Sequence, residues 1–219
     1  MKKLLFLTVF IFIFIAISAQ KISNVDFDSV KTALDAKPGL YKELIDRFKK
    51  ADSTLIADEF KVLYYGQCFQ ENYKPYGGDG KDFDKFKEHY EKEDYKKALP
   101  FVIKILDEDP IDLKMMFKAL VCYHILNDQE NKAAMQMRYE SILYTLFLSG
   151  DGKTRETAFV VMRVSDEYEA MSNMQVENSS QSLSGDCDVM TLKKNDYGLE
   201  SLYFNISKPF SSLSKLLKN

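Results

Sequence analysis

Apolar residues recur at intervals of three and four from Phe27 to Leu148, and turn residues interrupt them at short distances. This spacing is the period of an α-helix, and it places the apolar side chains of each segment on one face. The predicted helices carry Val30 and Leu34; Leu40, Leu44, Ile45 and Phe48; Phe60, Leu63, Tyr64 and Phe69; Phe83, Phe86 and Tyr90; Tyr95 to Leu106; Leu113 to Leu126; and Ala133 to Leu148. Between the third and the fourth lies Asn72 to Gly80, whose proline and three glycines predict a loop. This part of the chain is therefore expected to form antiparallel helical hairpins.

The pattern changes after the turn Ser149 to Gly152. The predicted elements are a strand at Ala158 to Met162, a short helix at Ser165 to Met171, two antiparallel strands at Asp188 to Lys193 and Leu199 to Ile206, and a helix that begins at Pro209. The polar segment Glu177 to Ser184 fits either an edge strand or a loop. The predicted fold is α+β and mainly α, with a small C-terminal antiparallel sheet and a terminal helix. We expect a helical region over 20–149 and an α+β unit over 150–219, packed together or side by side.

The first nineteen residues, MKKLLFLTVFIFIFIAISA, are typical of a secretory signal peptide. Two lysines precede an apolar run from Leu4 to Ile17, and small residues follow it. At about 1.5 Å per residue this run spans roughly 21 Å, short of the roughly 30 Å core of a bilayer. We therefore expect cleavage after Ser18 or Ala19, no stable membrane anchor, and export to the periplasm or the extracellular space.

Charge and cysteine content narrow the function classes. Without Lys2 and Lys3 the chain carries 28 basic and 33 acidic side chains, a net charge of −5. A nucleic-acid-binding protein needs a basic surface, so no nucleic-acid partner is expected. The three cysteines, Cys68, Cys122 and Cys187, lie in different predicted elements, and we expect no structural disulfide.

One helical hairpin resembles a tetratricopeptide repeat. Asp94 to Leu99, DYKKAL, followed by Leu106 to Pro110, LDEDP, is similar to the second helix of such a repeat. The twelve-residue step from Ala98 to Pro110 has the spacing of the small residue and the terminal proline of that motif. Only one unit and a degenerate second are visible, so the resemblance implies repeat-like hairpins and not a repeat array.

A second resemblance covers most of the chain after the leader. It is carried by Leu63 to Gly66 (LYYG) with Phe69, Tyr73 to Gly77 (YKPYG), Thr157 to Val161 (TAFVV), Ser165 to Tyr168 (SDEY) and Leu202 to Ile206 (LYFNI). In order and composition these segments resemble a family of exported bacterial proteins known only as a domain of unknown function, numbered 4919. The resemblance implies an exported bacterial protein and no particular activity.

The candidate catalytic and metal-binding patterns are incomplete. Gly152-Lys153-Thr154 matches the end of a phosphate-binding loop, but Phe147 stands where the first glycine is required. Asp79, Asp82 and Asp84 do not have EF-hand spacing, and Asp82 is expected to cap a helix.

Cys122 and His124 are two residues apart on a helix, so they point to different faces. We therefore predict no catalytic residue, no cofactor and no metal site.

Aromatic residues cluster before and inside the predicted loop. Tyr64 has the helical period of a core residue, whereas Tyr65, Tyr73 and Tyr76 are the candidate partner- or ligand-binding residues. A tyrosine offers a flat apolar face and a hydroxyl group, which suits a sugar or a protein partner. The loop tyrosines Tyr73 and Tyr76 either bind a ligand or pin the loop to its own helices.

The expected function is a non-catalytic protein-interaction module of the cell envelope, with a protein partner there. The first alternative is glycan or small-ligand binding through the Tyr73 and Tyr76 loop. The second is a hydrolase with two carboxylates, because the chain is rich in acidic residues but carries no motif for such an enzyme.

Overall fold

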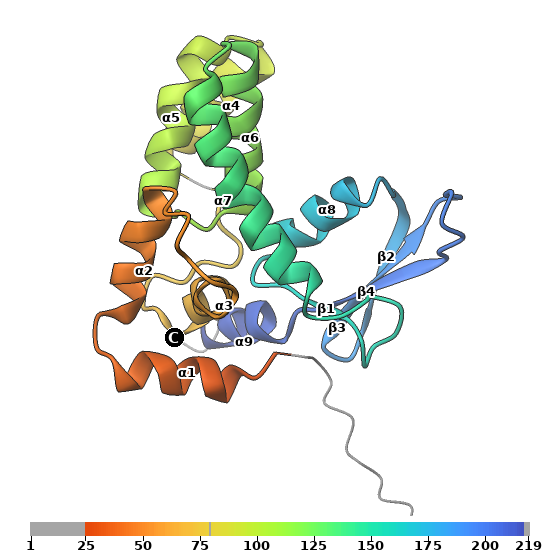
Figure 1. Cartoon of the computed structure of the whole chain (residues 1–219). Helices are drawn as coiled ribbons and strands as arrows, with labels where there is room; N and C mark the ends of the chain where they lie inside the picture. Colours follow the sequence, from red (N-terminus) through yellow and green to blue (C-terminus); the bar gives the residue numbers. More distant parts are fainter. Residues whose placement is uncertain (1–24, 79, 217–219) are drawn as a thin grey trace, which may run out of the picture.

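The computed structural model describes residues 25–78 and 80–216 (Figure 1). The helices are α1 (Phe27–Ala36), α2 (Leu40–Lys49), α3 (Ala57–Gly66), the 3-10 helix η1 (Gln67–Phe69), α4 (Lys81–Glu91), α5 (Tyr95–Glu108), α6 (Leu113–Ile125), α7 (Gln129–Phe147), α8 (Val164–Asn173) and α9 (Ser207–Leu216). The strands are β1 (Phe159–Val160), β2 (Asn178–Ser184), β3 (Cys187–Leu192) and β4 (Ser201–Asn205). The predicted class, α+β and mainly α with a C-terminal sheet and a terminal helix, is confirmed.

Helices α4 to α7 form two successive hairpins, in which α4 packs on α5, α5 on α6, and α6 on α7. Aspartates cap three of these helices: Asp94, Asp112 and Asp128 each accept a hydrogen bond from a backbone N–H three residues later. Such caps satisfy N–H groups that have no partner inside the helix, which fixes where each helix begins. Ala98 is fully buried in α5. The hairpins are therefore observed, and their likeness to tetratricopeptide repeats stays a prediction.

The four strands form one sheet in the order β1-β4-β3-β2. Strands β2, β3 and β4 are antiparallel neighbours, as expected for the last two of them. The segment Glu177 to Ser184, for which the sequence left two alternatives open, contains the edge strand β2. Strand β1 is only two residues long and pairs in parallel with β4. The sheet is therefore mixed and not wholly antiparallel.

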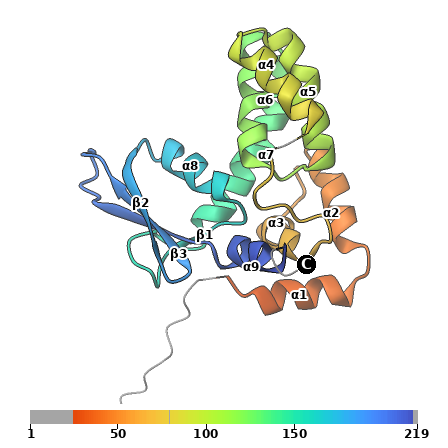
Figure 2. The same ribbon diagram turned by 180° about the vertical axis from the view of Figure 1, so that it is seen from behind.

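The helical part and the sheet share buried side chains. The bundle α4–α7 and the sheet with α8 extend in different directions from α3 and the C-terminal half of α7 (Figures 1 and 2). One continuous apolar cluster runs through both, from Phe48 in α2 through Met135 in α7 to Phe204 in β4. Cys68, Cys122 and Cys187 form no disulfide, as expected.

The described residues include no helix that is both long and apolar enough to cross a membrane. The predicted signal peptide, residues 1–19, lies outside the described residues. Asp79, one of the three aspartates considered for a calcium site, also lies outside them. The prediction that Asp82 caps α4 is wrong. The N-cap position is Gly80, and the Asp82 carboxylate instead pairs with Lys104 at 2.5 Å.

Candidate functional site

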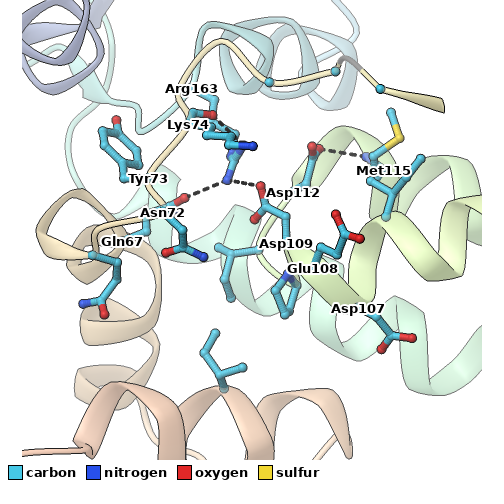
Figure 3. A pocket seen from close by; sticks show the side chains of 18 of the residues that line it. Gln67, Asn72, Tyr73, Lys74, Asp107, Glu108, Asp109, Asp112, Met115 and Arg163 are labelled. Carbon is cyan, nitrogen blue, oxygen red and sulfur yellow. Dashed lines mark hydrogen bonds and ion pairs between the residues drawn. The ribbon is translucent and has the colours of Figure 1, made fainter. Parts of the chain in front are cut away.

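A pocket of about 650 Å³ opens where α2, η1 and the loop after it, the start of α4 and the junction between α5 and α6 meet (Figure 3). Its size is that of a small-molecule site, for which roughly 300–1,000 Å³ is usual. Arg163, which precedes α8, also lines it. We call this cavity the Arg163 pocket. It brings together segments that lie about ninety residues apart in the chain.

Arg163 holds the walls of the pocket together. Its side chain is almost completely buried. Nη1 donates to the backbone carbonyl of Lys74 at 3.0 Å, and Nη2 donates to Oε1 of Gln67 at 3.2 Å. Nη2 also lies 2.5 Å from Oδ2 of Asp109. One guanidinium group therefore fixes η1, the loop and the α5–α6 junction relative to one another (Figure 3).

The electrostatics keep this guanidinium charged. Burial by itself would lower the pKa of Arg163, but the carboxylates of Asp109, Asp112 and Asp166 raise it above its usual value. The burial that works against the charge is thus more than offset by three acidic neighbours. Arg163 is a permanent cation at the inner wall of the pocket.

A second buried network fixes the first turn of α8 behind Arg163. Oδ2 of Asp166 accepts from the hydroxyl of Tyr64 at 2.7 Å and from the backbone N–H of Arg163 at 3.1 Å. The hydroxyl of Tyr64 in turn accepts from the N–H of Met162 at 3.3 Å. Burial raises the pKa of Asp166 to about 7, with Arg163 acting in the opposite direction. Tyr64 is a core residue, as its helical period predicts.

Most carboxylates of the pocket already have partners. Asp107 lies 2.8 Å from Lys49, Asp82 pairs with Lys104, and Asp109 with Arg163. Asp112 caps α6, and burial raises its pKa. A carboxylate that is engaged in this way is poorly placed to act as a nucleophile or as a general base. The carboxylates of the lining are therefore largely engaged before any ligand enters.

The three predicted tyrosines lie in different environments. Tyr65 is only 1% exposed and donates to the carbonyl of Thr145 at 3.2 Å, so it presents almost no surface to a ligand. Tyr73 lines the pocket and donates to the carbonyl of Met162 at 2.5 Å, which pins the loop to the segment before α8. Tyr76 is half-exposed and does not line the pocket. Only Tyr73 of the three therefore belongs to the Arg163 pocket.

Arg163, Gln67, Asp109 and Asp112 were not singled out by the sequence patterns. One signal did exist: Arg163 is the single charge in the apolar run from Ala158 to Val164. A charged side chain at the end of a buried strand is costly unless it is paired, so it marks a site with partners. The identity of those partners depends on long-range packing.

The other candidate motifs have structural roles. Gly152 has a φ of +68°, and a Cβ there would lie 2.5 Å from the ring of Phe159. The glycine is thus required by a close approach to β1 and not by a phosphate. Among residues 25–78 and 80–216, no group of three or more potential metal ligands is gathered.

Of the comparisons with known proteins, only the one with family models gives a match. The model of a family described as a domain of unknown function, DUF4919, matches residues 29–215. No curated protein and no solved structure matches the chain.

Proposed function

The chain belongs to the DUF4919 family, a domain of unknown function, and from that premise we propose that it is an exported, non-catalytic binding protein that holds a small neutral saccharide in the Arg163 pocket. Export is proposed from the leader sequence, with the cell envelope or the extracellular space as the location.

The observation that carries this proposal is the pocket itself, whose inner wall is held by Arg163 and its three protein partners. The lining offers three kinds of surface: donors at Lys74, Lys81 and Asn72, an acceptor at Glu108, and apolar contacts at Ile45, Phe83 and Ile105. A sugar ring matches this mixture, because each hydroxyl group both donates and accepts and the ring faces are apolar.

The engaged carboxylates count against a cationic ligand. Four of the five acidic residues of the lining, Asp82, Asp107, Asp109 and Asp112, already have a cation or a backbone N–H as partner. A positively charged ligand would have to displace these contacts, and leaving a partly buried charge unpaired is costly. The same engagement counts against the carboxylate hydrolase considered from the sequence.

Isothermal titration of the mature chain with a panel of mono- and disaccharides tests the proposal. Asn72 lines the pocket, and its neighbour Glu71 is exposed and does not. We expect Asn72→Trp to fill part of the cavity and to weaken binding at least tenfold, whereas Glu71→Trp leaves the affinity unchanged. If wild type binds no saccharide, or if both variants bind as wild type does, the pocket is not a saccharide site.

A second candidate is the protein-interaction role expected from the sequence. Phe117 and Ile125 on α6, Leu126 directly after it, and Tyr144 on α7 are exposed. Exposed aromatic side chains are common anchors of protein interfaces. Crosslinking in the native cell envelope tests this role with Tyr144→Ser and the equally exposed Tyr197→Ser as its control. We expect only Tyr144→Ser to lose the partner captured by wild type. Equal capture by both variants would exclude this surface.

A further inference from the structure

Strand β2 (Asn178–Ser184) is an open edge of the sheet. One side of it pairs with β3, and no segment among residues 25–78 and 80–216 pairs with its other side. The strand lies on the side of the molecule opposite α1 and α2 (Figures 1 and 2). Backbone N–H and C=O groups that point outward from such an edge can pair with another strand. Strand β2 therefore offers a position for one more strand.

The side chains of β2 do not protect this edge. Edge strands are usually blunted by lysine, proline or other charged residues. The segment from Asn178 to Ser184, NSSQSLS, contains none of these, and every residue after the first is exposed. Its register shift lies between Asn178 and Ser180, so the pairing with β3 is regular from Ser180 to Ser184. An uncharged and regular edge is suited to strand addition.

The edge is complementary to a second copy of itself. A two-fold axis through Gln181, the middle residue of β2, aligns the strand with an antiparallel copy over its whole length. Ser180 then lies opposite Ser182 of the second copy, and no like charges meet. Gln181 is held in place, because its Nε2 donates to Oδ2 of Asp188 at 2.8 Å and its Oε1 accepts from the hydroxyl of Tyr168 at 3.1 Å. The centre of the contact is therefore fixed before association.

Opposite charges meet at the two ends of this alignment. Glu177, which precedes β2, comes to lie opposite Gly185 of the second copy. The guanidinium of Arg155 packs so closely against Gly185 that a Cβ there would collide with it. Arg155 pairs with Asp186 and remains about half-exposed, and the Glu177 side chain is 75% exposed beside Lys193, so each can take a second partner. The two-fold axis thus brings the carboxylate of one copy to the cation of the other.

Two exposed apolar side chains lie beside the axis. Leu183 is 58% exposed and Tyr168 is 45% exposed. The hydroxyl of Tyr168 on α8 reaches Gln181, and Leu183 lies two residues after Gln181 in the strand, so both are on the face of the sheet that α8 covers. A two-fold axis perpendicular to the sheet keeps the α8 helices of both copies on this face. Association therefore removes apolar surface from water.

We propose that two copies of this chain associate through β2, in antiparallel pairing around Gln181, and form one continuous sheet across the dimer. A second copy fits the edge because β2 carries no charge that would repel it and because Glu177 and Arg155 lie at complementary ends. An edge of seven residues forms a small interface, so we expect the dimer to dissociate on dilution. The dimer does not depend on saccharide binding in the Arg163 pocket.

Sedimentation equilibrium of the mature chain over about a hundredfold range of concentration tests the dimer. We expect wild type to pass from monomer to dimer as the concentration rises. Ser180→Lys combined with Ser182→Lys places lysines opposite each other across the axis, whereas Ser180→Glu combined with Ser182→Lys places opposite charges there. We expect the second double variant to associate at least about tenfold more tightly than the first.

The two double variants are matched in position and differ in one charge. Ser180 and Ser182 are exposed, and their hydroxyl groups make no hydrogen bond to the residues that the structure describes. Circular dichroism should therefore show the fold of wild type in both variants.

Three results would overturn the dimer. If wild type stays monomeric at every concentration, the pairing with a second copy is excluded, even where the edge binds a strand of another protein. If both double variants associate as wild type does, the copies meet elsewhere. Hydrogen exchange of wild type gives a check without substitutions: protection of the β2 amides should rise with concentration, and unchanged protection would exclude β2 from the interface.

Discussion

Replacement of Arg163 by methionine tests whether one buried cation holds the pocket together. The substitution keeps an apolar stem of similar length and removes the two hydrogen bonds and the ion pair described above. It leaves the Gln67 oxygen, the Lys74 carbonyl and the Asp109 carboxylate without their donor.

Breaking a buried ion pair costs about 3–5 kcal/mol, and each hydrogen bond lost adds about 1 kcal/mol. Asp109 is 32% exposed and can regain water, which favours the lower part of this range. We therefore expect Arg163→Met to lower the free energy of unfolding by about 5 kcal/mol, about 3 from the ion pair and about 2 from the two hydrogen bonds. For a chain of this size that corresponds to a fall in Tm of roughly 10–20 °C.

Urea unfolding followed by circular dichroism measures this difference. The control is Arg155→Met: Arg155 is about half-exposed and pairs with Asp186 at 3.1 Å, so its loss is expected to cost less than about 1 kcal/mol. Arg163→Lys keeps the charge but offers no planar fork of donors, and it should fall between wild type and Arg163→Met. Equal effects of Arg163→Met and Arg155→Met would refute the reasoning.

Three further predictions concern the pH dependence of stability, a glycine and the loop tyrosines. Because burial raises the pKa of Asp166 to about 7, the folded protein holds a proton that the unfolded chain loses above about pH 4. The free energy of unfolding therefore falls as pH rises from about 4 to 7, by about 1.4 kcal/mol per pH unit from this residue. Asp166→Asn cannot titrate, so urea unfolding of this variant at a series of pH values should lack that contribution to the slope. Gly152→Ala should cost about 1–3 kcal/mol more than Gly198→Ala in thermal unfolding, because both have positive φ but only the first Cβ would clash with a ring. Tyr73→Phe should lower the free energy of unfolding by about 1 kcal/mol through its lost hydrogen bond. The hydroxyl of Tyr76 makes no hydrogen bond to the residues that the structure describes, so Tyr76→Phe should lower it by less than about 0.5 kcal/mol.

The helices could be predicted from the sequence because their signals are local. The apolar period gives the buried face of each helix, and the predicted starts of α5 at Tyr95 and of α6 at Leu113 are confirmed. Helix α7 begins at Gln129, four residues before the predicted Ala133, because its first turn is polar and its start is defined by the cap Asp128. The parallel pairing of β1 with β4 could not be predicted, because two-residue strands carry too little pattern to define a partner.

The site could be predicted only in part, because its contacts join distant segments. The loop and Tyr73 were candidates from composition and residue type. Arg163, by contrast, reaches Gln67 across 96 residues, and Tyr64 reaches Asp166 across 102. Helical period placed Tyr64 in the core but gave no information about its hydroxyl. Local patterns describe which face of an element is buried, and not which polar groups meet there.

The buried charges are not spread through the core but concentrate around the first turn of α8. Arg163, Asp166 and Glu167 are all buried there within five residues. Removing ionisable groups from water is costly, and apolar residues of similar size often stabilise a core equally well or better. Stability alone therefore gives little reason for three such residues in one turn. The turn instead positions Arg163 at the pocket through Asp166 and Tyr64. This concentration of charge favours a role of the α8 turn in the binding function we propose.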